Sequence, residues 1–293
     1  MQRMKLQITS TTLTLALLTA TGPVFAQEET TGTETGGETT LSETSQGGET
    51  APPTADMAAP AGGSRLAVEF AKRPLTNGRF ILVPQLDFTL AKAGAGDPGI
   101  ALALGATFGV TDDLDVYATV LPLALAPAAG YGDIALGGTF RFMKGNTEVG
   151  LRVDVYLPTS TVIHLSAGVP ILFHFGDKMR LDTGLMADFT TFDPFSFQLR
   201  IPLQLGFQLI PMLAAQLRTG YTLPLAPSTP GPDAMAIPLG VAAIISIPGK
   251  NNQPMLDIIP AFDWGAFLTP AGASAVNADV FTLTVTAKFY LFI

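Results

Sequence analysis

The sequence predicts an all-β protein, a closed antiparallel transmembrane β-barrel of about 12 strands preceded by a disordered N-terminal tether. Apolar and polar residues alternate from about residue 78 to the end, which is the period of strands with two different faces. Only 14% of the residues are charged, against about 25% in ordinary soluble domains. The body of the chain nevertheless has no apolar run of about 18 residues that could form a spanning helix.

Residues 1–26 have the features of a secretory signal peptide. Arg3 and Lys5 precede the apolar run LTLALLTATGPVF, and Val24 and Ala26 are the small residues expected before a cleavage site. An uncleaved anchor helix is the alternative, but the run is short and is interrupted by Thr, Gly and Pro. We therefore expect an exported chain, and the absence of cysteine excludes a disulfide framework.

Residues 27–64 form an acidic segment, QEETTGTETGGETTLSETSQGGETAPPTADMAAPAGGS, with seven acidic residues and no basic one. Its apolar content is too low to offset the entropy of ordering, so we expect a disordered tether. It is either a plain spacer or an arm that binds a periplasmic or envelope partner. Without the signal and the tether, 14 basic and 17 acidic residues remain, a net charge of −3 that gives no case for nucleic-acid binding.

The remaining part, 65–293, is expected to be the barrel. An average strand of a soluble protein has about 5 to 6 residues, and the expected strands are longer. They are long enough to cross a bilayer, which takes about 9 to 11 residues. A soluble β-sandwich with one wet face is the alternative, but its strands would be shorter. The strands are expected at 79–91, 99–111, 114–125, 132–143, 147–158, 162–175, 179–190, 195–210, 213–225, 234–248, 254–268 and 278–293.

The links between these strands alternate in length. TDD, KGN, GDK, IPM and PGKNNQ follow every second strand, whereas links such as KAGAGDPG, APSTPGPDA and TPAGASAVNA follow most of the others. Short turns at one end, longer loops at the other and an even strand number are typical of outer-membrane barrels, and they predict both termini on the periplasmic side. Closure is required because an open sheet edge in lipid would leave backbone groups unpaired.

Residues 148–160, EVGLRVDVYLPTS, indicate which face is which. Glu148, Arg152 and Asp154 are expected to face the lumen, and the aliphatic residues between them, beginning with Val149, the acyl chains. A charge on the lipid face would cost about 2 to 4 kcal/mol at the middle of the membrane, so the alternation is under energetic pressure.

The expected lumen carries charges of both signs. They either pair into a network that closes the lumen or line a narrow wet passage, and 12 strands leave an interior between those of a packed eight-stranded barrel and a 16-stranded porin. Prolines inside the strand segments are expected at bulges or strand ends, because proline cannot donate to the ladder. The lumen-lining candidates are Arg141, Glu148, Arg152, Asp154, His164, Arg180, Asp182, Arg200, Arg218, Asp257, Asp263 and Lys288.

Three local patterns occur between residues 105 and 160: FGVTDDLDV, GYGDIALGGTFRF and VYLPTS. Together they resemble the "MetA-pathway of phenol degradation" family of outer-membrane proteins, with its strand–turn–strand, GxGD and LPT(G/S) elements. The resemblance implies a barrel that passes small, often apolar, solutes, and it supplies no catalytic residue. Each pattern also has a purely structural reading, since Thr111, Asp112 and Asp113 are good turn residues.

The sequence gives little support for catalytic activity or metal binding. His164 and Ser166 share one face of a strand and could hydrolyse an ester, but nucleophilic catalysis also needs an orienting group and oxyanion donors. A lumen-lining histidine beside a small serine is the favoured alternative. His164 and His174 are about 33 Å apart along an ideal strand, too far to share a metal. We expect no enzyme, no cofactor and no metal site.

We therefore expect an outer-membrane channel for passive uptake of small solutes, including hydrophobic or aromatic ones, through a mixed-charge lumen. Its partners would be outer-membrane lipids and the solute, together with an envelope component that meets the tether. A structural or adhesive barrel with a closed lumen is the alternative.

Overall fold

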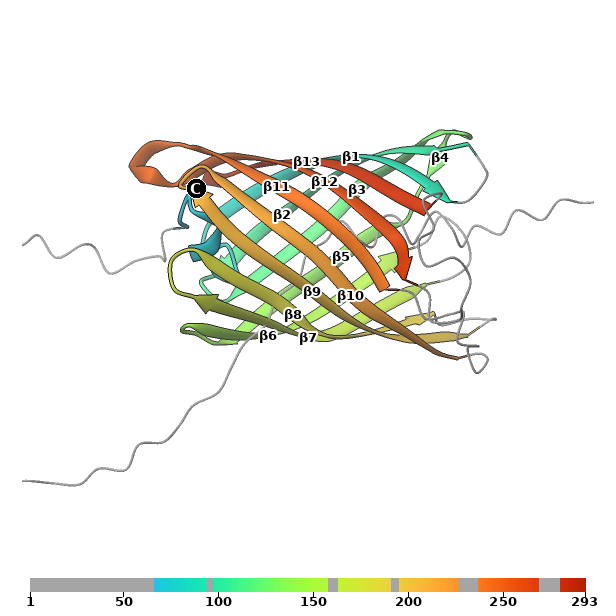
Figure 1. Cartoon of the computed structure of the whole chain (residues 1–293), viewed down its shortest axis with the longest axis horizontal. Helices are drawn as coiled ribbons and strands as arrows, with labels where there is room; N and C mark the ends of the chain where they lie inside the picture. Colours follow the sequence, from blue (N-terminus) through green and yellow to red (C-terminus); the bar gives the residue numbers. More distant parts are fainter. Residues whose placement is uncertain (1–65, 94–96, 158–162, 191–194, 227–236, 269–279) are drawn as a thin grey trace, which may run out of the picture.

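The computed structural model describes residues 66–93, 97–157, 163–190, 195–226, 237–268 and 280–293, and the strands among them form one antiparallel sheet (Figure 1). The expected signal peptide and tether lie outside the described residues. Two short 3₁₀ helices occur, η1 (Phe70–Lys72) and η3 (Lys250–Asn252). No helix in the described part is long and apolar enough to cross a membrane. The strands are β1 (Ile81–Ala93), β2 (Gly99–Thr111), β3 (Leu114–Ala126), β4 (Gly130–Tyr131), β5 (Ile134–Met143), β6 (Thr147–Leu157), β7 (His164–Phe175), β8 (Met179–Thr190), β9 (Ser196–Ile210), β10 (Leu213–Ala226), β11 (Ile237–Pro248), β12 (Pro254–Leu268), β13 (Val280–Phe289) and β14 (Leu291–Phe292).

The sheet closes on itself. Each long strand pairs with the next one along the chain, and β13 pairs with β1 from Gln85↔Lys288 to Ala93↔Val280. The two-residue strand β14 extends this seam by pairing with the start of β1. The other two-residue strand, β4, pairs with β3. The remaining long strands form the closed antiparallel barrel that the alternation predicts, and closure satisfies the backbone groups that an edge would expose.

Most strand boundaries lie within three residues of the expected positions. β1 begins at Ile81 and not at residue 79, because the two preceding residues belong to a turn. The expected strand 132–143 corresponds to β5, which begins at Ile134 after the separate two-residue strand β4, and the expected strand 278–293 is divided into β13 and β14. The short links 112–113, 144–146, 176–178, 211–212 and 249–253 all lie at one end of the barrel, here called the turn end, where the C-terminus also lies (Figure 1).

The two faces of the strands differ as expected. On β6, Leu151 and Val153 are 49% and 47% exposed, whereas Arg152 and Asp154 are 8% and 2% exposed. An apolar outer surface on strands of this length is that of a barrel that spans a membrane. Val149 departs from the prediction that it faces lipid, since it is buried at the turn end. It lies beside the register shift where β5 skips a residue against β6.

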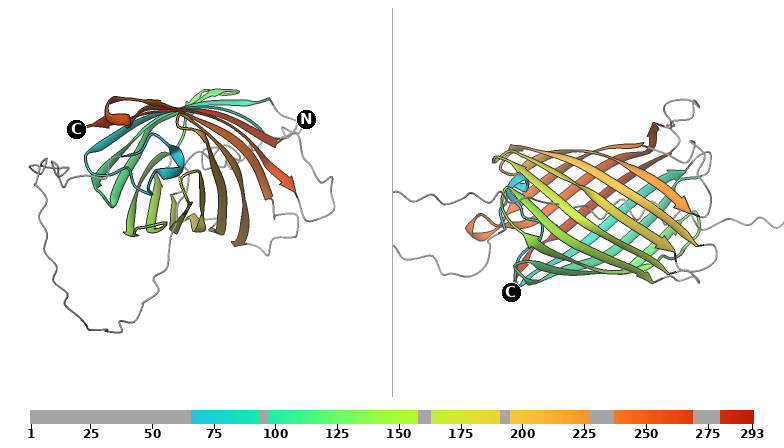
Figure 2. Two further views of the ribbon diagram at one scale, coloured as in Figure 1. Left: turned by 60° about the vertical axis from the view of Figure 1, so that its left-hand side comes forward. Right: turned by 90° about the horizontal axis from the view of Figure 1, so that it is seen from below.

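Residues 66–80, here called the inner segment, do not join the wall but lie within the turn end of the barrel (Figure 2). Hydrogen bonds tie this segment to β3, β6, β7, β8, β9, β11 and β12. A segment that contacts strands around most of the wall can reach them only from inside. The interior at this end is therefore filled by the chain itself.

The strand prolines are only partly explained by bulges. Pro224 and Pro238 flank register shifts, as proline's missing donor predicts. Pro84, Pro170 and Pro202 instead lie within continuous register, opposite Ala106, Gly184 and Gly220 respectively. In each of these three pairs the partner is a small residue, which leaves room for the pyrrolidine ring.

Candidate functional site in the barrel lumen

Arg73 of the inner segment occupies a site built by the barrel wall. Its Nη1 and Nη2 donate to the two carboxylate oxygens of Asp257 on β12, the Nη2 contact being 3.0 Å. Nη2 also donates to Ser246 Oγ on β11 at 2.9 Å. Tyr290 OH lies 3.2 Å from Nη1 and donates to Asp257 at 2.6 Å. All four side chains are buried, so the ion pair lies largely out of water.

Backbone groups of η1 add further contacts. The Ala71 amide donates to Gln208 Oε1 at 3.0 Å, and His174 Nδ1 donates to the Ala71 carbonyl at 2.8 Å. Arg180 Nη1 donates to the carbonyls of Phe70 and Arg73, at 3.1 and 2.9 Å. The Arg180 guanidinium also pairs with Asp182 two residues along β8. The wall thus satisfies backbone groups that a turn inside a barrel would otherwise leave unpaired.

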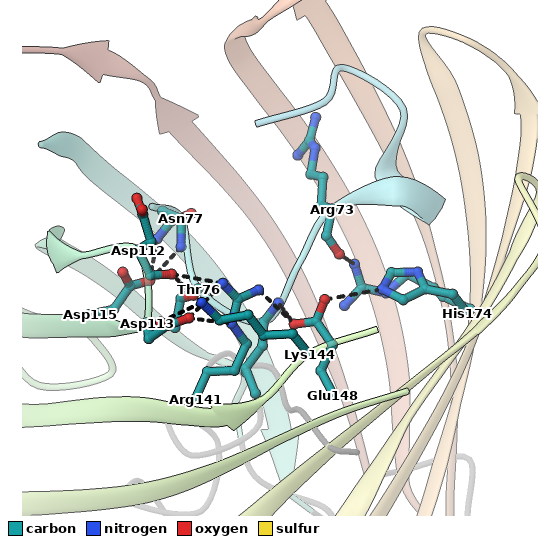
Figure 3. Close-up of polar contacts among 12 residues, drawn as sticks. Arg73, Thr76, Asn77, Asp112, Asp113, Asp115, Arg141, Lys144, Glu148 and His174 are labelled. Carbon is teal, nitrogen blue, oxygen red and sulfur yellow. Dashed lines mark hydrogen bonds and ion pairs between the residues drawn. The ribbon is translucent and has the colours of Figure 1, made fainter. Parts of the chain in front are cut away.

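A second cluster holds the middle of the inner segment (Figure 3). Arg141 lies between Asp113 and Glu148, 2.8 and 2.9 Å away. Glu148 Oε2 also accepts from the Leu75 amide at 2.9 Å, and its Oε1 is 3.5 Å from His174 Nε2. Glu148 therefore connects the wall to the inner segment.

Asp113 lies in the turn between β2 and β3, outside the spanning strands. Lys144 Nζ contacts its carboxylate at 2.6 Å, and Arg141 contacts it at 2.8 Å. Partial burial acts to raise the pKa of Asp113, but the hydrogen bonds and charges of Lys144 and Arg141 outweigh it and hold the pKa below its ordinary value. This carboxylate is thus stabilised in its ionised form.

The end of the inner segment is fixed near the same turn. Thr76 Oγ1 donates to the Asp112 carbonyl at 2.8 Å. The amide and the side chain of Asn77 both donate to Asp115 Oδ2 at 2.8 Å, as Figure 3 shows. Asp115 Oδ1 is buried and has no hydrogen-bond partner among the described residues.

Further along the lumen, the predicted residues pair mostly with one another. Arg152 Nε is 2.8 Å from Asp154 Oδ2, and its Nη2 donates to Tyr117 OH at 2.8 Å. Arg218 is 2.9 Å from Asp263, across from β10 to β12. Arg200 pairs with Asp188, an acidic residue on β8. The guanidinium groups of the lumen therefore each have a carboxylate.

A cavity of about 280 Å³ lies inside the barrel next to the inner segment. Leu66, Phe70 and Arg73 of the inner segment line one side of it. The wall also lines the cavity and contributes six of the sequence-predicted residues, which are Arg152, Arg180, Asp182, Arg218, Asp257 and Lys288. Among these six, Lys288 alone has no ion pair or hydrogen bond within the described part of the chain.

His164 and Ser166 are not arranged for ester hydrolysis. Ser166 is 1% exposed, and its hydroxyl has no hydrogen-bond partner among the described residues, so His164 does not activate it. His164 is half-buried at the start of β7, at the end of the strand opposite to the turn end. No group of three or more metal-binding side chains occurs in the part of the chain that the structure describes.

Sequence reasoning missed the inner segment. Arg73, Thr76 and Asn77 were not candidates, because the stretch RLAVEFAKRPLTNGRF does not sustain the alternation of apolar and polar residues that marks a strand. A usable signal is that this stretch has basic residues, which the acidic tether before it lacks, and a larger share of bulky apolar residues. The partners of Arg73, up to 217 residues away, could not be found from spacing.

Comparison with known proteins supports the fold alone. No family model matches the chain, and no curated protein matches it in sequence. The NanC porin structure aligns with a TM-score of 0.52 at 7% identity, covering 72% of this chain and 100% of NanC. The translocator domain of the autotransporter NalP from Neisseria meningitidis (0.45, 11% identity, 71% of this chain and 87% of that one) and Omp33 from Acinetobacter baumannii (0.40, 11%, 72% and 98%) are more distant.

Proposed function

We propose that this protein is an outer-membrane channel that passes small solutes without an energy source, with both termini on the periplasmic side. The closed barrel, its apolar outer surface and its charged interior support a membrane-spanning protein with a polar lumen. The fold is shared with NanC, which is described as a porin. The turn end would then face the periplasm, as short turns do in such barrels.

The cavity is the observation that carries this proposal. A purely structural barrel has no need of an internal space, whereas here about 280 Å³ remain between the inner segment and the wall. The lining alternates charged groups such as Arg152 and Asp182 with apolar ones such as Ile244 and Ile259. Such a surface suits a small solute with both a polar and an apolar part.

The inner segment would act as the gate. It is held by many hydrogen bonds and ion pairs, and among the described residues its buried apolar cluster with the wall consists of Leu66, Ile81, Val83 and Tyr290. Polar contacts of this kind can be exchanged for water when the segment moves, whereas a large apolar interface would resist release. The structure thus represents the closed form of the proposed channel.

We further propose that the solutes of this channel include hydrophobic or aromatic compounds. The resemblance of residues 105–160 to the MetA-pathway family favours hydrophobic or aromatic solutes, and Phe70 and Ile259 in the cavity are compatible with them. No family model supports the resemblance, so it adds an expectation about the solute and nothing about the fold.

Single-channel recording in planar bilayers tests the proposal. The refolded protein should give discrete conductance steps, and Arg152→Ala should change their size or ion selectivity because Arg152 lines the cavity. Lys178→Ala, which removes a charge from an exposed turn, is the matched control and should leave the steps unchanged. A correctly folded barrel that stays silent at all voltages, also after Arg73→Ala has loosened the inner segment, would refute a channel.

A second candidate is a structural barrel whose lumen never opens. The buried Arg73–Asp257 pair favours it, because a buried pair resists separation. The same recordings decide between the two. Steps that appear when the inner segment is loosened support the gated channel, and silence with the segment loosened supports the structural barrel.

A further inference from the structure

We propose that the cavity binds the carboxylate of a small organic acid and that Lys288 is the group that recognises it. This inference rests on the proposed channel function and deepens it by naming a solute class. Three observations support it: the position of Lys288, the lack of a direct partner for its ammonium group among the described residues, and the other groups in the cavity.

Lys288 lies on the inner face of β13 and lines the cavity. In the sheet register it stands between Gln85 of β1 and Asp257 of β12. Directly opposite residues in an antiparallel sheet point to the same face, with their Cβ atoms about 4.5 to 5.5 Å apart. Lys288 therefore sits at the β1–β13 seam next to the site that Arg73 occupies.

The carboxylate of Asp257 is not available to Lys288. Arg73 donates to both of its oxygens, and Tyr290 OH donates to Oδ2 at 2.6 Å. Since Asp257 is only 1% exposed, little of its surface remains for a further donor. In the closed form Asp257 is neutralised by the inner segment and not by Lys288.

The second nearby acid, Asp87, is also engaged. Its Oδ2 accepts from Gln85 Nε2 at 2.6 Å, and its Oδ1 accepts from Thr286 Oγ1 at 2.5 Å. Both acids act on Lys288 through space, but neither forms an ion pair with it among the described residues. The Lys288 ammonium thus has nearby counter-charges but no direct partner in the part of the chain that the structure describes.

The other cations of the cavity differ from Lys288 in this respect. Each guanidinium that lines the cavity has its own carboxylate, in the pairs Arg73–Asp257, Arg152–Asp154, Arg180–Asp182 and Arg218–Asp263. An ammonium in a confined site gains most from a direct, charge-assisted hydrogen bond. An anionic ligand can supply that bond, and a planar carboxylate is small enough to do so.

The rest of the cavity defines the body of the ligand. The amides of Gln204 and Gln216 line it and make no hydrogen bond among the described residues, so they can meet further polar atoms. Ile244, Ile259 and Phe70 offer an apolar surface. The geometry points to a short organic acid with one carboxylate and an apolar body, of a size that fits within about 280 Å³.

Equilibrium binding to the full-length protein in detergent micelles tests the inference, with butyrate as the probe and butyramide as its uncharged counterpart. Butyrate should bind about tenfold more tightly than butyramide, because only the carboxylate forms a charge-assisted bond. Lys288→Met should remove this preference, and Lys288→Arg should retain it. Lys178→Met, a charge removed from an exposed turn, should leave it unchanged.

Equal binding of the two probes by the unaltered protein would overturn the inference, and this comparison needs no variant to fold. A preference that survives in a folded Lys288→Met barrel would also overturn it. Because binding is measured without permeation, its failure is separate from that of the channel. Conductance without a preference for the carboxylate would contradict the binding site but not the channel. A preference for the carboxylate without conductance would contradict the channel but not the binding site.

Discussion

The guanidinium of Arg73 and the carboxylate of Asp257 form a buried ion pair inside the barrel, although the two residues are 184 positions apart in the chain. The pair joins the inner segment to β12, whereas Leu75 of the same segment contacts β6, which lies half-way around the closed strand order from β12. It therefore fixes the inner segment across the mouth at the turn end, and it is the contact whose loss should loosen that segment most.

Arg73→Ala should release the inner segment and raise the frequency of open events in planar bilayers. Removing one partner of a buried pair leaves the other charge uncompensated, which costs about 3 to 5 kcal/mol. Arg79→Ala is the matched control, because Arg79 belongs to the same segment and is exposed. Equal open frequencies in the two variants would show that the Arg73 site does not hold the mouth closed.

A charge on the outer face should destabilise the barrel according to depth. Leu151, 49% exposed, lies near the middle of β6, so Leu151→Arg should lower the free energy of unfolding in lipid vesicles by about 2 to 4 kcal/mol. Phe142, 53% exposed near the turn end of β5, is the control, and Phe142→Arg should cost about 0 to 1 kcal/mol. Equal costs would contradict a membrane-spanning outer surface.

The faces of the strands could be predicted from the sequence because lipid and interior impose opposite requirements on adjacent residues. Leu151 and Arg152 illustrate this, since a shift of one residue would exchange them between the two faces. The same requirement does not fix details at the turn end, where Val149 is buried beside a register shift. There the wall contacts the inner segment as well as lipid. The alternation of apolar and polar residues therefore no longer predicts which side chains are exposed.

The partners of the lumen charges were only partly predictable. Arg152 and Asp154 are two residues apart on one strand, so their proximity follows from the alternation. Arg73 and Asp257 have no such relation, and no local pattern shows that residues 66–80 turn into the barrel. That arrangement follows from closure of the sheet, which brings strands distant in the sequence around one short segment.

Asp113 should make the stability of the barrel depend on acid pH. Its pKa is lower in the folded protein than its ordinary value of 3.8, mainly because Lys144 and Arg141 outweigh the effect of burial. A group with a lowered folded pKa stabilises the protein above its unfolded pKa, and this contribution is lost as pH falls through the folded pKa. Urea midpoints of the wild type should therefore fall between about pH 5 and pH 2.

Asp113→Asn should reduce stability at neutral pH and flatten this part of the profile. Lys144→Met removes one of the two cations beside Asp113 and should shift the acid loss toward higher pH. If the wild type and Asp113→Asn have parallel profiles between these pH values, Asp113 does not contribute in the way its contacts indicate.

Covalent fixation of the inner segment tests the gate most directly. The chain has no cysteine, so Asn77→Cys and Asp115→Cys introduce the two thiols of the protein, at positions whose side chains are in contact. A short, reducible thiol cross-linker can join them, and single-channel recording compares the linked and reduced forms. We predict that the linked protein is silent and that reduction restores discrete openings. Identical conductance in both forms would contradict a mouth closed by residues 66–80.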